Sequence, residues 1–68
     1  NTNVVQITDK TIVEDALGRY DLLSVDAQTK LTAEKALLDS LLVEINRQES
    51  IQNEINLFRI NKAIALAL

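Results

Sequence analysis

The chain has 68 residues, with ten acidic and seven basic side chains, a net charge of −3, and neither cysteine nor histidine. This length allows one small domain, which would bury only about 60% of the surface that its unfolded form exposes. Without cysteine, disulfides cannot reinforce so small a core. Without histidine, the chain lacks the commonest metal ligand and general base. The charge balance disfavours nucleic acid and anionic membrane surfaces as partners, because both attract a basic stripe.

The composition favours helices over strands. Hydrophobic residues make up 47% of the chain, yet only Tyr20 and Phe58 are aromatic, there is no proline, and Gly18 is the one glycine. A β domain of this size needs several turns with Gly, Asn or Pro chemistry. The longest uninterrupted apolar run, residues 63–68, is far shorter than the roughly 20 residues of a membrane-spanning helix. We therefore predict an all-α fold without a spanning helix.

The first elements are short. Residues 1–8 are polar and β-branched without a helical period, and they predict an extended or disordered segment before a helical module over residues 9–68. Thr11 and Glu14 have the spacing of a capping box at a helix start. Gly18 is expected to end that helix in a left-handed conformation, although it could also be tolerated inside a longer one. The chain begins at Asn1 and not at methionine, so we expect a processed or excised chain or a fragment.

From about Asp21 onward the sequence predicts one long helix. With Leu31 at heptad position a, its apolar stripe lies on a, d and e, but beyond Ile51 it moves to d and g. A two-stranded coiled coil keeps a and d throughout. Either one helix has different neighbours along its length, or two helices meet at the polar residues 46–50; the continuous helix is favoured because Arg, Gln and Glu are good helix formers. The predicted packing residues are Leu31, Leu37, Leu38, Leu41, Leu42, Ile45, Ile51, Ile55 and Phe58.

Catalysis is not expected of this chain. Serines such as Ser24 have neither a histidine partner nor a nucleophile elbow, and the paired carboxylates Glu14 and Asp15 lack the pocket that acid–base work requires. Neither an EF-hand spacing nor a glycine-rich phosphate loop is present. We predict no catalytic, cofactor or metal site.

The C-terminal residues 57–68 are apolar on most sides around Arg59, Asn61 and Lys62. A helix that is apolar all round must be covered by something. These residues either complete the chain's own small core or form a docking surface for other protein chains.

Residues 18–28 (GRYDLLSVDAQ) resemble a segment of TolC-like outer-membrane channel proteins, and residues 29–60 resemble the long helix that follows it in that family. The sequence departs from the family by lacking one leucine between Val25 and Asp26. It also departs by having NKAIALAL in place of the glycines and tryptophan expected after the helix, and by lacking the β-strands of the membrane barrel. The resemblance implies a fragment of the helical periplasmic duct, located in the periplasm or at the outer membrane, in which each helix contacts neighbours on both sides.

Two functions are therefore expected. The first is a structural helix-packing module in a homo-oligomer or larger assembly, with the efflux or secretion duct as its specific form. The second is a free-standing three-helix binding domain, with breaks near Gly18 and residues 46–50, that docks a partner through residues 57–68. The candidate partner contacts are Gly18, Asp21, Asp26 and Gln28, which the resemblance implies lie near the duct tip, together with Ile60 and Ile64.

Overall fold

Three α-helices and one short 3-10 turn make up the fold, which a computed structural model describes for residues 5–68. The turn η1 spans Ile7–Asp9 and is followed by α1 (Lys10–Asp21), α2 (Val25–Lys30) and α3 (Thr32–Leu66). Residues 5–68 contain no β-strand. The prediction of an all-α chain with a short helix followed by a long one is confirmed.

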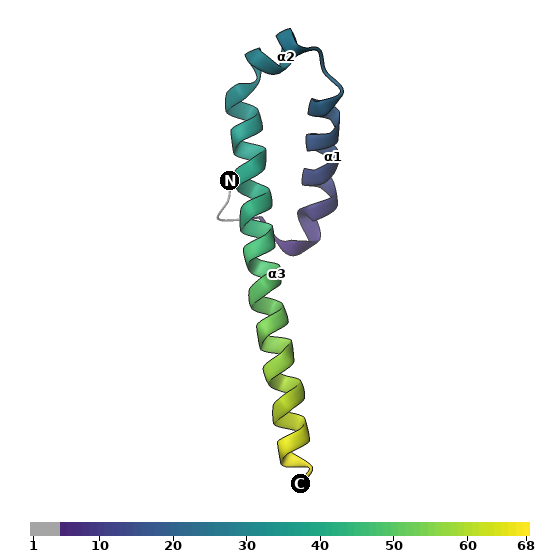
Figure 1. Cartoon of the computed structure of the whole chain (residues 1–68), viewed down its shortest axis with the longest axis vertical. Coiled ribbons are helices and arrows are strands. Elements are labelled where there is room, and N and C mark those ends of the chain that lie inside the picture. The colour runs from purple at the N-terminus through teal and green to yellow at the C-terminus, as the bar shows by residue number, and fades with distance from the viewer. Residues whose placement is uncertain (1–4) are drawn as a thin grey trace.

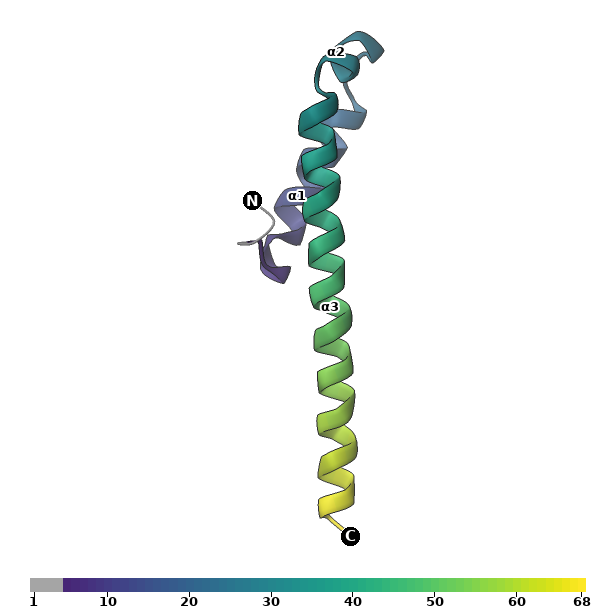
Figure 2. The same cartoon turned by 90° about the vertical axis from the view of Figure 1, so that its left-hand side faces the viewer.

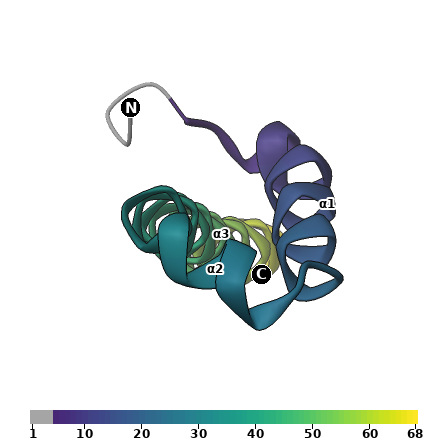
Figure 3. The same ribbon diagram turned by 90° about the horizontal axis from the view of Figure 1, so that it is seen from above.

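The molecule is a helical hairpin with one long free arm. Helix α1 lies antiparallel beside the first half of α3, α2 crosses the top, and the second half of α3 projects alone (Figure 1). The side view shows the same projecting arm, and the view from above shows α2 bridging the two longer helices (Figures 2 and 3). The extents are 63 × 21 × 14 Å and the radius of gyration is 17.6 Å. A compact chain of this length has a radius of gyration of about 11 Å.

The start of α1 differs from the sequence-based prediction. The helix begins at Lys10, so the capping box predicted at Thr11 and Glu14 is wrong. Instead, the Asp9 carboxylate accepts a hydrogen bond of 2.8 Å from the Gln6 backbone N–H and closes η1. Of the segment 1–8 predicted to be extended, residues 1–4 lie outside the described part of the chain, and the last two residues belong to η1.

The predicted break at Gly18 is also wrong. Helix α1 continues through Gly18 to Asp21, and Gly18 does not adopt a positive φ. The chain turns just after Asp21, at Leu22, Leu23 and Ser24, where Ser24 caps α2 by accepting a hydrogen bond of 3.3 Å from the Ala27 N–H. Glycine costs a helix only about 1 kcal/mol, so packing of α1 against α3 and the strong cap downstream decide where the helix ends.

The long helix begins later than predicted, at Thr32 and not near Asp21. Leu31 separates α2 from α3 with φ −110° and ψ 22°. The hydroxyl groups of Thr29, before this kink, and Thr32, after it, donate hydrogen bonds of 2.9 Å to the Val25 and Thr29 carbonyls respectively. Such local bonds compete with regular helix geometry. Beyond the kink, α3 is continuous through residues 46–50, as the favoured interpretation predicted.

The hydrophobic core lies between α1, α3 and the chain leading into η1. Its buried members are Val5, Val13 and Ile45, and Ile45 is completely inaccessible to solvent. The half-buried side chains packed against them are Leu17, Leu41 and Leu42. Because the core is this small, it accounts for the hairpin but covers nothing on the projecting arm.

Candidate helix-packing interface

The hairpin is fixed at its lower end by polar contacts to α3. The Lys10 ammonium group lies 2.8 Å from the Glu49 carboxylate, and this hydrogen bond raises the pKa of Lys10. One residue earlier on α3, the Gln48 side-chain amide donates a hydrogen bond of 2.9 Å to the Val5 carbonyl. Within residues 5–68, these are the hydrogen bonds nearest the C-terminus that join α3 to another part of the chain.

The apex of the hairpin is tied together by a reciprocal pair of side chain to backbone bonds. The Gln28 amide donates to the Tyr20 carbonyl at 3.0 Å, and the Tyr20 hydroxyl donates to the Gln28 carbonyl at 3.4 Å. The Lys35 ammonium group lies 5.5 Å from the centre of the Tyr20 ring. Lys35 also pairs with Asp39 at 2.8 Å, and that hydrogen bond raises the pKa of Lys35. These bonds hold α2 against the ends of α1 and α3.

The predicted contact residues at the apex have different surroundings. Asp21 and Asp26 are exposed at the end of α1 and in α2, and Gly18 is exposed in α1. Gln28 is half-buried and engaged with Tyr20, so it is a structural residue of the apex. Sequence reasoning did not single out Leu22, which is 87% exposed in the turn. The available signal was a pair of leucines between the polar residues Asp21 and Ser24.

The predicted packing residues fall into two groups. Leu41, Leu42 and Ile45 belong to the core region, and Leu31 and Leu38 are half-buried. The exposed members are Leu37, Ile51, Ile55 and Phe58. The periodicity therefore identified side chains that pack inside the chain together with side chains that the chain leaves uncovered.

Every residue from 51 to 68 is exposed. The side of α3 that meets α1 carries Ile45 and Glu49; one heptad further along, the same side carries Gln52 and Asn56. The covered face therefore becomes polar where α1 and η1 stop. This change explains how the arm can extend beyond the hairpin without leaving an apolar continuation of the core in water.

Apolar side chains on the arm gather in two stripes on opposite sides of the helix. We call the first the Ile51 stripe; it contains Ile51, Ile55, Phe58, Lys62 and Ala65 at alternating spacings of four and three residues. The second, the Leu57 stripe, contains Leu57, Ile60 and Ile64. Ile51 and Ile60 are nine residues apart, which places them about 180° apart around the helix.

The exposure of these stripes is large. Phe58 is 68% exposed, Leu57 is 61% exposed and Ile64 is 59% exposed. Contiguous apolar surface of this kind marks an interaction site more often than a free surface. Ile60 and Ile64, which were predicted to contact a partner, lie together on the Leu57 stripe, whereas Leu57 was predicted only as the first residue of the docking segment 57–68.

A charged pair limits the Ile51 stripe on its N-terminal side. Arg47 donates hydrogen bonds of 2.6 and 2.8 Å to the Glu44 carboxylate, and Gln48 donates a third at 3.2 Å. The Arg47 bonds, followed by the Gln48 bond, lower the pKa of Glu44 to about 2. Glu44 lies one heptad before Ile51 on the same side of α3, so the apolar stripe gives way to an ionised carboxylate there.

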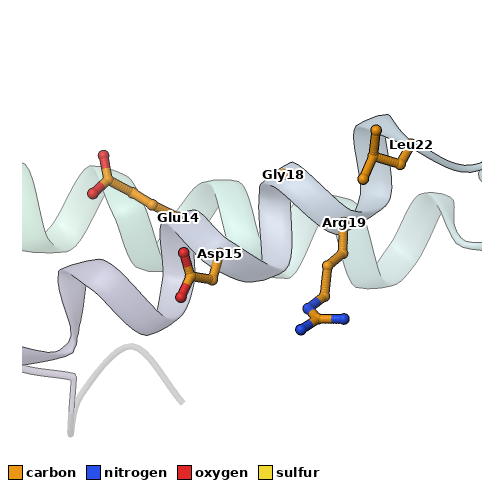
Figure 4. A pocket seen from close by; sticks show the side chains of 5 residues that line it. All are labelled: Glu14, Asp15, Gly18, Arg19 and Leu22. Atoms are coloured by element: carbon orange, nitrogen blue, oxygen red, sulfur yellow. The ribbon is translucent and has the colours of Figure 1, made fainter.

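An open depression lies on α1 around Gly18. Its lining comes from α1 and the residue that caps it: Glu14, Asp15, Gly18, Arg19 and Leu22 (Figure 4). All five are exposed, and a Cβ atom at Gly18 would meet nothing within 4 Å. One convex helix face that lacks a side chain at its centre does not enclose a substrate. Within residues 5–68 there is also no group of acidic side chains that could hold a metal ion.

No helix in the described part of the chain has the length and apolar character required to cross a membrane. No protein-family model matches the chain, and neither a curated protein nor a solved structure is significantly similar to it.

Proposed function

We propose that the chain is a structural helix-packing module whose projecting arm packs against helices of other protein chains in an oligomer or larger assembly. The observation that carries this proposal is the exposure of residues 51–68, which bear apolar stripes on two opposite sides of one helix. A helix with two such sides is suited to two neighbours, one on each side.

The energy available from covering one stripe is substantial. Burying a Leu or Ile side chain completely contributes about 1.5–3 kcal/mol. Leu57, Ile60 and Ile64 are 57–61% exposed, so covering all three is worth roughly 3–5 kcal/mol by the same scale. This is similar to the whole stability of many small domains. Assembly therefore supplies a stabilisation that the small hairpin core does not.

The specific form of the proposal is a segment of a helical duct, as in TolC-like channels, which would place the chain in the periplasm or at the outer membrane. The resemblance of residues 18–60 to that family supports it. A second support is the position of the hairpin turn at Leu22, Leu23 and Ser24, inside the segment 18–28 on which the resemblance depends. Asp21 and Asp26 flank this turn and are the candidate contacts for a protein at the tip.

A compact three-helix binding domain would require a turn at residues 46–50, and α3 is helical there. Among residues 5–68, no other helix covers residues 57–68. This favours partner chains as the covering surface.

The test is small-angle X-ray scattering with mass from the same data, on the intact chain and on two variants. The first variant replaces Ile55 and Phe58 on the Ile51 stripe, and Ile60 and Ile64 on the Leu57 stripe, with glutamine; the matched control replaces Gln52 and Asn56, on the polar side of the same segment, with alanine. We expect a mass of two or more chains for the intact protein and the control, and a lower mass for the first variant. A monomer with a radius of gyration near 17.6 Å in all three samples would refute assembly through the arm.

A further inference from the structure

The Ile51 stripe has the spacing of a coiled-coil seam. Numbered for this segment alone, Ile55 and Lys62 occupy heptad position a, and Ile51, Phe58 and Ala65 occupy position d. A seam of this kind is covered by a second helix that carries a matching seam. The stripe lies about 120° from the core residue Ile45 around α3, so a helix packed on it does not compete with α1.

Opposite charges flank this seam at the spacing that a parallel pair uses. Glu54 occupies position g and Arg59 occupies position e of the next heptad, five residues later. Residues five apart do not face each other on one helix, and neither side chain forms an ion pair within residues 5–68. In a parallel, in-register pair, position g of one helix faces the following e of the other. Two symmetric Glu54–Arg59 contacts then form between the copies.

We propose that a second copy of this chain packs in parallel and in register along the Ile51 stripe, with Glu54 of each copy facing Arg59 of the other. This inference rests on the proposed function and specifies the neighbour on one side of the arm. The seam then consists of like layers of Ile51, Ile55 and Phe58, closed at its flanks by the two charge pairs.

Lys62 is consistent with this arrangement. A single lysine at position a lowers the stability of a coiled coil but fixes its register and the number of strands. The aliphatic stem of Lys62 covers the seam while its ammonium group reaches solvent. An antiparallel pair would instead set Ile51 against the partner's Lys62 and leave Arg59 opposite the uncharged Gln52.

The hairpin allows the two copies to separate above the seam. Toward the N-terminus the same side of α3 carries Gln48 and Glu44, which are engaged in hydrogen bonds within the chain. These polar positions end the pairing near Ser50, where α1 and η1 begin to cover α3. The Leu57 stripe has the uncharged Asn56 and Asn61 at its edges. Because complementary charges flank the Ile51 stripe and not the Leu57 stripe, the second copy is placed on the Ile51 stripe.

A charge-swap cycle on the intact chain tests the contact and its direction. Glu54→Arg alone, or Arg59→Glu alone, turns two attractions into two repulsions, and we expect the dimer dissociation constant to rise about tenfold. The double variant E54R/R59E restores the opposite charges and should return the constant to within about threefold of the original. Asn56→Arg, outside the seam, is the matched control and should leave it unchanged.

A cysteine probe reads the register directly, because the chain contains no other cysteine. Ala65→Cys in the parallel pair places the two thiols in one layer, where mild oxidation should link the copies covalently. Preferential linking of Ala65→Cys to Gln48→Cys in a mixture would overturn the parallel register in favour of an antiparallel one. If the chain forms an oligomer but the double variant E54R/R59E does not restore the dissociation constant and Ala65→Cys does not link the copies, this inference is overturned and the proposed function stands. A monomer at every concentration would overturn both.

Discussion

The replacement Ile45→Ala tests the hairpin core most severely. Ile45 is completely inaccessible to solvent and joins Val5 and Val13 as one of the buried side chains of the described residues. The change removes three carbon atoms, worth about 2.4 kcal/mol in transfer free energy, and leaves a cavity whose lining loses packing contacts. We therefore expect a loss of about 3 kcal/mol in the free energy of unfolding of the hairpin.

The assay is urea denaturation followed by circular dichroism, together with amide hydrogen exchange in α1. Ile12→Ala is the matched control, because Ile12 is 70% exposed on α1 and the same atoms are removed. The control should change the free energy of unfolding by no more than about 0.5 kcal/mol. If Ile45→Ala cost less than about 1 kcal/mol, or no more than Ile12→Ala, α1 would not pack on α3 as described.

Three further predictions concern Gly18 inside α1, the Glu44–Arg47 ion pair and the apex of the hairpin. Gly18→Ala should raise the free energy of unfolding by about 0.5–1 kcal/mol, since the helical backbone accepts a Cβ atom that meets nothing within 4 Å; a decrease in thermal stability would indicate a left-handed conformation at Gly18. The pKa of Glu44 is depressed from its ordinary value of 4.5, so the ionised carboxylate stabilises the fold at pH values above 4.5. This contribution should disappear as the pH falls toward about 2. Glu44→Gln should flatten the dependence of the unfolding midpoint on pH over that range, and an unchanged slope would contradict the Glu44–Arg47 pairing. Gln28→Ala removes the hydrogen bond from the Gln28 side-chain amide to the Tyr20 carbonyl. The free energy of unfolding, measured by thermal denaturation, should fall by about 1 kcal/mol without a change in the oligomeric mass; a change in mass would instead mark Gln28 as a partner contact.

Periodicity and the absence of turn residues were sufficient to predict an all-α chain in which a short helix precedes a long one, but not the separate helix α2. The continuity of α3 through residues 46–50 followed from side chains that favour helices. The shift of the apolar stripe beyond Ile51 also had a structural counterpart. At that level α1 and η1 no longer cover α3, and the arm continues uncovered. These features depend on local sequence and on the spacing of side chains along one helix.

The turns depended on interactions that spacing does not reveal. Gly18 was the obvious breaking point, but the chain turns at Leu22, Leu23 and Ser24, and the Tyr20–Gln28 bonds that hold this turn form only when α2 folds back on the end of α1. Leu31 is a good helix former, and its kink accompanies the threonine hydroxyl bonds around it. The attachment of Val5 to Gln48 joins residues 43 positions apart, which a reading of neighbouring residues cannot anticipate.

The candidate interface was predicted only in part, because the sequence did not show which side of α3 is covered by α1. Ile51, Ile55 and Phe58 were predicted to pack, and Ile60 and Ile64 were predicted to contact a partner, but one helical wheel did not separate them by neighbour. The position of α1 supplies the missing reference, because it shows which side of α3 is already covered. Two uncovered sides then remain on the arm.

Sedimentation equilibrium of the intact chain over a wide range of concentrations tests the central claim most directly. Assembly through the arm predicts that the mass rises with concentration to at least twice the 7.6 kDa of one chain. A mass that remains at 7.6 kDa up to millimolar concentration would show that the exposed stripes do not bring copies of this chain together, and it would contradict the account of the arm as a self-assembling surface.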